Sequence, residues 1–275
     1  MRATPNVSTS TQSTLRTTAE TLENNAVAVH YEGTLPATPL DAFSAFTTRD
    51  ATSAWIWPIA YEPCVGGREG GLSGGEGGAV TVWEPGRALS TRVEGDNDWY
   101  NQLDYVLTPT ADGQTHLSYT HSTVFPEDFD TQLEACTLHT DLYNHSLGEY
   151  LAHFNGRAGT ATILDGPDTS ATANAFGTVL HALSLSTPPT LGEQTQFDVP
   201  GIGSISAVVD YATDTFLGLR DADTLYRVFG RGRWGWPTGI SIHRIAPAGA
   251  SALPEDASHD AAWQAWLDGL FANAV

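Results

Sequence analysis

The sequence predicts an α+β protein in which a curved antiparallel sheet surrounds one long helix, followed by a second, smaller copy of the same arrangement. Three observations predict this class. Short segments between residues 26 and 124 alternate apolar and polar side chains, as half-buried strands do. Residues 133–154 then carry apolar side chains at helical spacing. The order of these segments recurs after residue 158, which indicates a repeat.

The first half begins with a predicted strand over 26–34 and a short helix that starts at Pro39. Residues 66–78 are rich in glycine and predict a hairpin or a flexible loop. Two strands, over 79–83 and 88–93, follow and are joined by a turn that contains proline and glycine.

Two further strands, over 101–107 and 116–124, flank Asp112-Gly113, a dipeptide typical of hairpins. The long helix over 133–154 comes next, and Asn155-Gly156 predicts its end. This order of strand, helix, antiparallel strands and long helix favours a sheet packed on the terminal helix.

The second half repeats the order with weaker signals, and a truncated sheet is an open alternative there. It contains two expected helices, over 174–185 and 260–271, and expected strands over 204–211, 215–220, 225–229 and 239–245. We therefore expect a disordered leader over 1–25, one domain over 26–157 and a second over 158–275.

The charge balance excludes several functions. The chain of 275 residues has a formal net charge of −20, and all 12 of its basic residues are arginine. Without lysine it cannot form a Schiff base or a phosphate-binding loop that ends in lysine. A protein without a basic stripe is not expected to bind nucleic acid or an anionic membrane surface.

The chain is expected to be cytoplasmic. It carries no apolar run long enough to span a bilayer, and its first 25 residues contain no apolar signal segment. Its two cysteines, Cys64 and Cys136, match neither a zinc spacing nor a redox motif. Reduced structural thiols are the expectation, and a disulfide between them stays an alternative.

Five segments in the first half occur in a characteristic order. They are the helix PLDAFSAFTT followed by Trp55, then EPCVGGRE, GAVTVWEPGRAL, HLSYTHSTV and the long helix. In this order the first half resembles the SRPBCC superfamily, and more narrowly its activator-of-heat-shock-ATPase-like branch. The second half is similar to the C-terminal part of two-part actinobacterial members, through VVDYATDTFLGLRDADTLYRVFGR and AWQAWLDGLF.

This resemblance implies a helix-grip fold with a cavity between the sheet and the long helix. Members of the superfamily hold apolar or polycyclic ligands there, and a few are enzymes. The resemblance therefore implies a protein that binds a small apolar or aromatic molecule. No cofactor and no metal are expected. A homodimer is an open alternative for its assembly.

Aromatic and histidine side chains are the candidate ligand-binding residues. They are Trp55, Trp57, Trp83, Trp99, Tyr105, Tyr119, His121, His139 and Tyr143. Each has a plainer interpretation, because aromatic residues also fill cores and a strand histidine is often buried and satisfied by the backbone. A metal site is not expected, since His139 and His153 lie about 21 Å apart along one helix.

Two alternatives to a non-catalytic binding protein remain. The first is an enzyme of the cyclase or hydrolase kind, in which His121 is the general base and pocket tyrosines assist. This alternative requires an orienting carboxylate, for which Glu62, Glu69 and Asp104 are candidates. The second is a chaperone co-factor or another protein-interaction module, which follows from the narrower branch.

Overall fold

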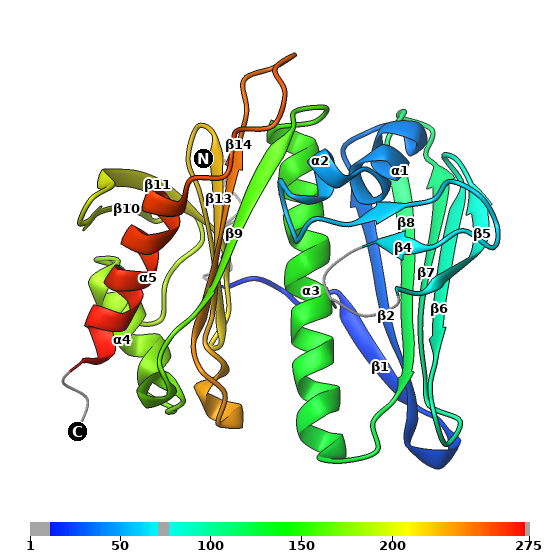
Figure 1. Cartoon of the computed structure of the whole chain (residues 1–275), viewed down its shortest axis with the longest axis horizontal. Helices are drawn as coiled ribbons and strands as arrows, with labels where there is room; N and C mark the ends of the chain where they lie inside the picture. The colour runs from blue at the N-terminus through cyan, green and yellow to red at the C-terminus, as the bar shows by residue number, and fades with distance from the viewer. Residues whose placement is uncertain (1–11, 71–76, 273–275) are drawn as a thin grey trace, which may run out of the picture.

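The computed structural model describes residues 12–70 and 77–272. The expected flexible loop over 66–78 lies partly outside these ranges, as do residues 1–11 of the expected leader. The described chain forms an α+β structure with two antiparallel six-stranded sheets. Figure 1 shows the long helix α3 between the two sheets, with further helices beyond the second one.

The first sheet comes from the first half of the chain, in the order β1-β2-β8-β7-β6-β5. Its strands are β1 (Thr17–Thr21), β2 (Ala26–Leu35), β5 (Ala79–Glu84), β6 (Ala88–Glu94), β7 (Tyr100–Pro109) and β8 (Thr115–Val124). A small second ladder pairs β3 (Ala60–Tyr61) with β4 (Glu69–Gly70). Helices α1 (Pro39–Thr47) and α2 (Arg49–Thr52) follow β2, and α3 (Phe129–His153) follows β8.

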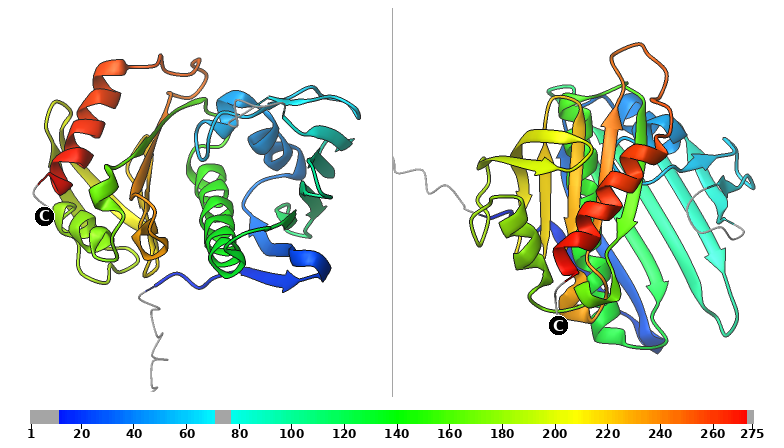
Figure 2. Two further views of the ribbon diagram at one scale, coloured as in Figure 1. Left: turned by 60° about the horizontal axis from the view of Figure 1, so that its bottom comes forward. Right: turned by 60° about the vertical axis from the view of Figure 1, so that its left-hand side comes forward.

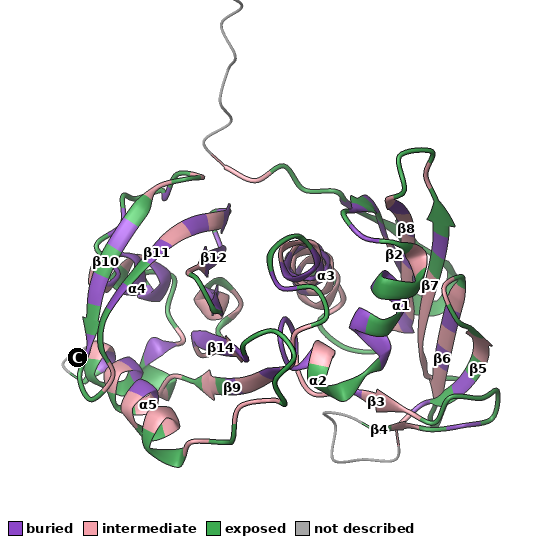
Figure 3. Ribbon diagram, turned by 90° about the horizontal axis from the view of Figure 1, so that it is seen from above, coloured by how far each residue is buried: buried purple, intermediate pink, exposed green. Residues whose placement is uncertain are grey.

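The second sheet has the order β10-β11-β12-β13-β14-β9. Its strands are β9 (Gly159–Asp165), β10 (Gln194–Val199), β11 (Gly203–Ala212), β12 (Phe216–Arg220), β13 (Thr224–Phe229) and β14 (Gly239–Ile245). Helices α4 (Ala175–Ala182) and α5 (Ala257–Phe271) cover its outer face, as seen in Figures 2 and 3. Short 3-10 turns occupy Glu23–Asn25, Asp168–Ser170 and Arg231–Trp234.

The two sheets have the same connection order. In each, the first long strand pairs with the last strand, β2 with β8 and β9 with β14, and a helix follows both members of the pair. The alternative of a truncated second sheet is wrong, because this sheet has as many strands as the first. Strands β9 and β10 had not been predicted.

The expectation of a disordered leader through residue 25 is also wrong where the chain is described. Thr17–Thr21 forms the edge strand β1, which pairs with β2 from Thr17 opposite Tyr31 to Thr21 opposite Val27. Thr17 and the backbone N–H of Arg16 both donate to the buried carboxylate of Asp141 on α3. The polar side chains of β1 do not predict a strand, because pairing with a distant segment stabilises it.

Helix α3 packs on both sides. Leu147, Leu151 and Phe154 belong to the core of the first half, together with β2, β8 and α1. Leu138 and Leu142 instead pack with aromatic residues of the second sheet. The sequence places these five residues in one apolar stripe, but a helix between two sheets needs an apolar surface on each side.

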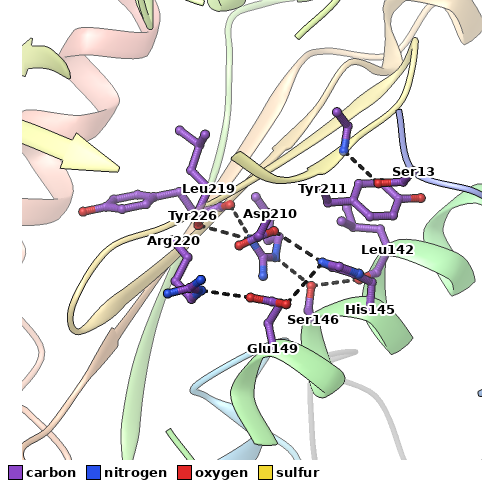
Figure 4. A network of polar contacts seen from close by, with 12 residues as sticks. Ser13, Leu142, His145, Ser146, Glu149, Asp210, Tyr211, Leu219, Arg220 and Tyr226 are labelled. Carbon is purple, nitrogen blue, oxygen red and sulfur yellow. Dashed lines mark hydrogen bonds and ion pairs between the residues drawn. The ribbon is translucent and has the colours of Figure 1, made fainter. Parts of the chain in front are cut away.

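A polar network joins α3 to the second sheet (Figure 4). Arg227 of β13 is 1% exposed and donates from Nε to Ser146 on α3 at 2.7 Å and from Nη1 to Asp210 at 3.1 Å. His145 of α3 lies 3.5 Å from the same Asp210 carboxylate. Burial acts to raise the pKa of Asp210, but Arg227 and His145 outweigh it and hold the pKa below its ordinary value.

Candidate functional site

A cavity of about 490 Å³ lies between the first sheet and α3. Strands β7 and β8 supply one wall, where Leu103 and Tyr105 alternate along β7 and Tyr119 and His121 along β8. Because side chains two residues apart share one face of a strand, all four point toward the helix. The opposite wall comes from one face of α3.

The wall on α3 follows helical spacing. Cys136 lines the cavity, and so do the residues three, four and seven positions after it, which are His139, Thr140 and Tyr143. The segment after α2 closes one end with Trp55 and Trp57. Trp55 is 4% exposed and is fixed by a hydrogen bond from its indole Nε1 to the Ala45 carbonyl at 2.9 Å.

Seven of the nine predicted residues line this cavity: Trp55, Trp57, Tyr105, Tyr119, His121, His139 and Tyr143. Trp83 does not, because its ring packs on Phe43 and Tyr61 in the core. Trp99 does not either, since it lies in the turn between β6 and β7. That the seven bind a ligand stays a prediction.

The aromatic rings contact one another around the cavity. Tyr105 stacks on Phe46 with ring centroids 4.5 Å apart and lies 4.7 Å from the ring of Tyr119. Burial raises the pKa of Tyr105, Tyr119 and Tyr143, so these phenols keep their protons at neutral pH. The wall is therefore mainly apolar with a minority of polar groups, a composition typical of small-molecule sites.

Glu69 contributes a carboxyl group to this lining. Burial raises its pKa, while a hydrogen bond with the Thr91 side chain acts to lower it. A carboxyl group whose charge is disfavoured is compatible with an uncharged ligand beside it.

A second, smaller cavity of about 190 Å³ shares Trp57 and Tyr143 with the first. These two rings line both cavities and meet edge to face, with centroids 5.1 Å apart. His139 also lines both, and its ring packs against Phe216 at 4.7 Å and Phe229 at 5.7 Å. The two cavities therefore share an aromatic wall, and the second half contributes to both, because Trp236 also lines the larger one.

The orienting carboxylate expected beside His121 is replaced by other partners. His121 Nε2 lies 2.6 Å from Asn101 Oδ1, and its Nδ1 lies 3.2 Å from Cys136 Sγ. Glu62 instead accepts from the backbone of Arg68. Asp104 is next to Leu103 on β7 and so lies on the opposite face, where it accepts from Gln102.

Sequence reasoning missed Asn101 and Cys136. Asn101 alternates with Leu103 and Tyr105 along β7, and Cys136 is three residues before His139 on α3, so both share the faces of predicted residues. Both cysteines are free thiols; Cys64 is exposed and Cys136 is half-buried. The partner of Cys136 was not visible in the sequence, because β8 brings it there through tertiary packing.

Within 12–70 and 77–272, no group of three or more His, Cys, Asp and Glu side chains is arranged to hold a metal ion. None of the helices in these ranges is long and apolar enough to cross a membrane.

Several solved structures are similar to this chain at low sequence identity. CalU16 from Micromonospora echinospora is 17% identical over 50% of this chain and 84% of its own, with a TM-score of 0.41. MLL2253 from Mesorhizobium loti is 22% identical over 46% and 98%, with a TM-score of 0.40. DynU16, a protein in the dynemicin biosynthetic locus, is 16% identical over 90% and 99%, with a TM-score of 0.38. No protein-family model matches the chain, and a search of curated proteins finds no match.

Proposed function

We propose that the protein binds a small apolar or aromatic molecule in the cavity between the first sheet and α3. The observation that carries this proposal is the cavity of about 490 Å³, whose walls are mainly aromatic and aliphatic side chains. Burial of such a ligand is favourable at roughly 25 cal/mol per Å² of apolar surface removed from water. The hydroxyls of Tyr105, Tyr119 and Tyr143 supply hydrogen-bond donors that would orient a carbonyl or hydroxyl of the ligand.

The proposal includes the architecture that the resemblance implies. We infer two helix-grip units of the SRPBCC kind, over 26–157 and 158–275, with the first in the activator-of-heat-shock-ATPase-like branch. The shared connection order of the two sheets supports this division. The binding cavity is lined mainly by the first unit, with Trp236 from the second, and α3 is the helix that the first unit packs against its sheet.

The test is a pair of tryptophan substitutions on one strand. Leu103→Trp places a large ring inside the cavity, whereas Val106→Trp places the same ring on the opposite face of β7, where Val106 is 48% exposed. Binding of naphthalen-2-ol and flavone is measured by isothermal titration calorimetry. We expect Leu103→Trp to weaken both by at least about tenfold and Val106→Trp to leave both unchanged.

Thermal unfolding of each variant, followed by circular dichroism, checks that the ring has not unfolded the sheet. If neither aromatic compound binds the unsubstituted protein, or if both variants bind as well as it does, the proposed function is wrong.

A further inference from the structure

Three side chains from three different elements form a hydrogen-bonded chain at the cavity wall. Cys136 of α3 places Sγ 3.2 Å from Nδ1 of His121 on β8. The other ring nitrogen, Nε2, lies 2.6 Å from Oδ1 of Asn101 on β7. All three residues line the cavity. A nucleophile, a base within hydrogen-bond reach and a third group that orients the base are the three parts of a catalytic triad.

The Asn101 contact decides which nitrogen of His121 carries the proton. A carbonyl oxygen can only accept, so Nε2 donates to Oδ1 and carries the hydrogen in the neutral ring. Nδ1 then has a free lone pair that faces the thiol. The Cys136 thiol therefore donates to a group that can take its proton.

The pair rests in its neutral form. Burial raises the pKa of the Cys136 thiol to about 11 and lowers that of His121 to about 4. The thiol is therefore not ionised in advance, and the proton moves only as the sulfur attacks.

We propose that Cys136, with His121 as its base and Asn101 orienting that base, adds covalently to an aromatic α,β-unsaturated carbonyl compound bound in the cavity. In this step the sulfur forms a bond to the β-carbon, and the thiol proton passes to Nδ1 of His121. The π electrons of the C=C bond move to the carbonyl oxygen as an enolate. The imidazolium then returns the proton to the α-carbon, which leaves a neutral thioether and a neutral histidine.

The surroundings of the thiol favour this addition over acyl transfer. Cys136 lies inside α3, where backbone N–H groups are bonded to the preceding turn and so are not free to hold a tetrahedral oxyanion. Conjugate addition places the negative charge on a more distant carbonyl oxygen instead. The protonated phenols of Tyr105, Tyr119 and Tyr143 line the same cavity and can donate to that oxygen.

The inference rests on the proposed function, because the aromatic part of the compound must occupy the cavity. The experiment uses 4-phenylbut-3-en-2-one as the probe and intact-protein mass spectrometry of the full chain as the readout. Its saturated analogue, 4-phenylbutan-2-one, cannot react and reports binding alone by calorimetry. Pent-3-en-2-one keeps the reactive group but lacks the phenyl ring.

The second cysteine is a matched control in the same chain. Cys64→Ser leaves Cys136 as the single thiol, and Cys136→Ser leaves the exposed Cys64. We expect the phenyl probe to modify Cys136 at least about 100-fold faster than Cys64, the gain typical of a positioned base. With pent-3-en-2-one, which lacks the ring that the cavity would hold, this advantage is expected to shrink.

Two substitutions test the roles of the partners in the Cys64→Ser background. His121→Gln removes the base and is expected to slow the addition by about 100-fold. Asn101→Ala removes the orienting group and is expected to slow it by about tenfold. The rates are compared at saturating probe, and the affinity of each variant for 4-phenylbutan-2-one is measured separately, so that a loss of binding is distinguished from a loss of reactivity.

The pH dependence of the addition rate tests the Cys136–His121 pair without substituting either residue, so the result does not depend on whether a variant folds. At a pH below its pKa, an isolated thiol reacts about tenfold faster for each unit by which the pH is raised, because only the thiolate attacks. A neutral thiol with a neutral histidine as base gives a nearly flat rate between about pH 6 and 9. The other titratable groups on the lining are Glu69, Tyr105, Tyr119, His139 and Tyr143, and Glu69→Gln checks that its carboxyl does not produce the profile.

The outcomes separate the two proposals. Binding of the saturated analogue without a Cys136 adduct overturns this inference and leaves the proposed function standing. Failure of the analogue to bind overturns this inference alone if naphthalen-2-ol or flavone binds, and overturns both proposals if neither of them binds. An adduct at Cys136 whose rate rises tenfold per pH unit, or is unchanged by His121→Gln, also overturns the triad.

Discussion

Arg227 of β13 donates from Nε to the Ser146 hydroxyl of α3 at 2.7 Å, and this bond joins the second sheet to the helix that also packs on the first. The same guanidinium pairs with Asp210, which is 3% exposed at its side chain. Arg227 is therefore a buried charge that its neighbours satisfy through Nε and Nη1.

Removing this arginine is expected to destabilise the protein strongly. Arg227→Met leaves the Asp210 carboxylate buried without its main counter-charge, which typically costs about 3–5 kcal/mol. Arg87→Met is the matched control, because Arg87 pairs with Glu84 at a side-chain exposure of 78%, and such pairs contribute about 0–1 kcal/mol. Urea unfolding followed by circular dichroism measures both. Equal losses in the two variants would show that the buried pair does not stabilise the junction.

Buried neutral histidines predict that acid destabilises the protein well above the range where carboxylates titrate. Burial lowers the pKa of His121 and His139 to about 4 and that of His243 to about 3, from an ordinary value of 6.5. The unfolded chain therefore binds protons at a higher pH than the folded chain, so stability falls as the pH drops below 6.5. Each such histidine costs on the order of 2 kcal/mol between pH 7 and 5.

Urea unfolding at these two pH values, with His243→Asn as the variant, measures the contribution of one histidine. His243 bonds the Ser53 carbonyl and Ser241, and asparagine keeps a donor and an acceptor without titrating. We expect the variant to lose about 2 kcal/mol less than the unsubstituted protein between pH 7 and 5. His181→Asn, at an exposed position of α4, is expected to leave the fall unchanged. If the free energy of unfolding fell by the same amount in both variants between pH 7 and 5, His243 would not be a source of the acid destabilisation.

Local patterns in the sequence predict most of the fold. Alternation predicts β2, β7 and β8, and helical spacing predicts α3 and α5, because each pattern reflects the face that the element buries. Strand β1 is missed because its residues are polar and its stability comes from pairing with β2. The double-sided packing of α3 is missed for a related reason, since no pattern within one helix says how many sheets will cover it.

In the site, too, local patterns predict some features and tertiary packing decides others. Aromatic residues at strand and helix spacing predict much of the cavity lining, including Tyr105, Tyr119 and Tyr143. The contact between Cys136 and His121 is not predictable in this way. It depends on the depth at which α3 sits on β8, which the packing of many residues sets together.

The edge-to-face contact of Trp57 and Tyr143 predicts how the cavity selects ligands by size. These rings line both cavities, of about 490 and 190 Å³, so Trp57→Ala is expected to connect the two. A compact ligand such as naphthalen-2-ol then loses an aromatic neighbour worth about 1 kcal/mol, or roughly fivefold in affinity. The longer flavone gains room, and we expect its affinity to hold or rise. Trp99→Ala is the control, since Trp99 does not line either cavity. Calorimetry on both ligands decides the matter, because a parallel loss of affinity would mean that Trp57 is only a contact surface and not the wall between the cavities.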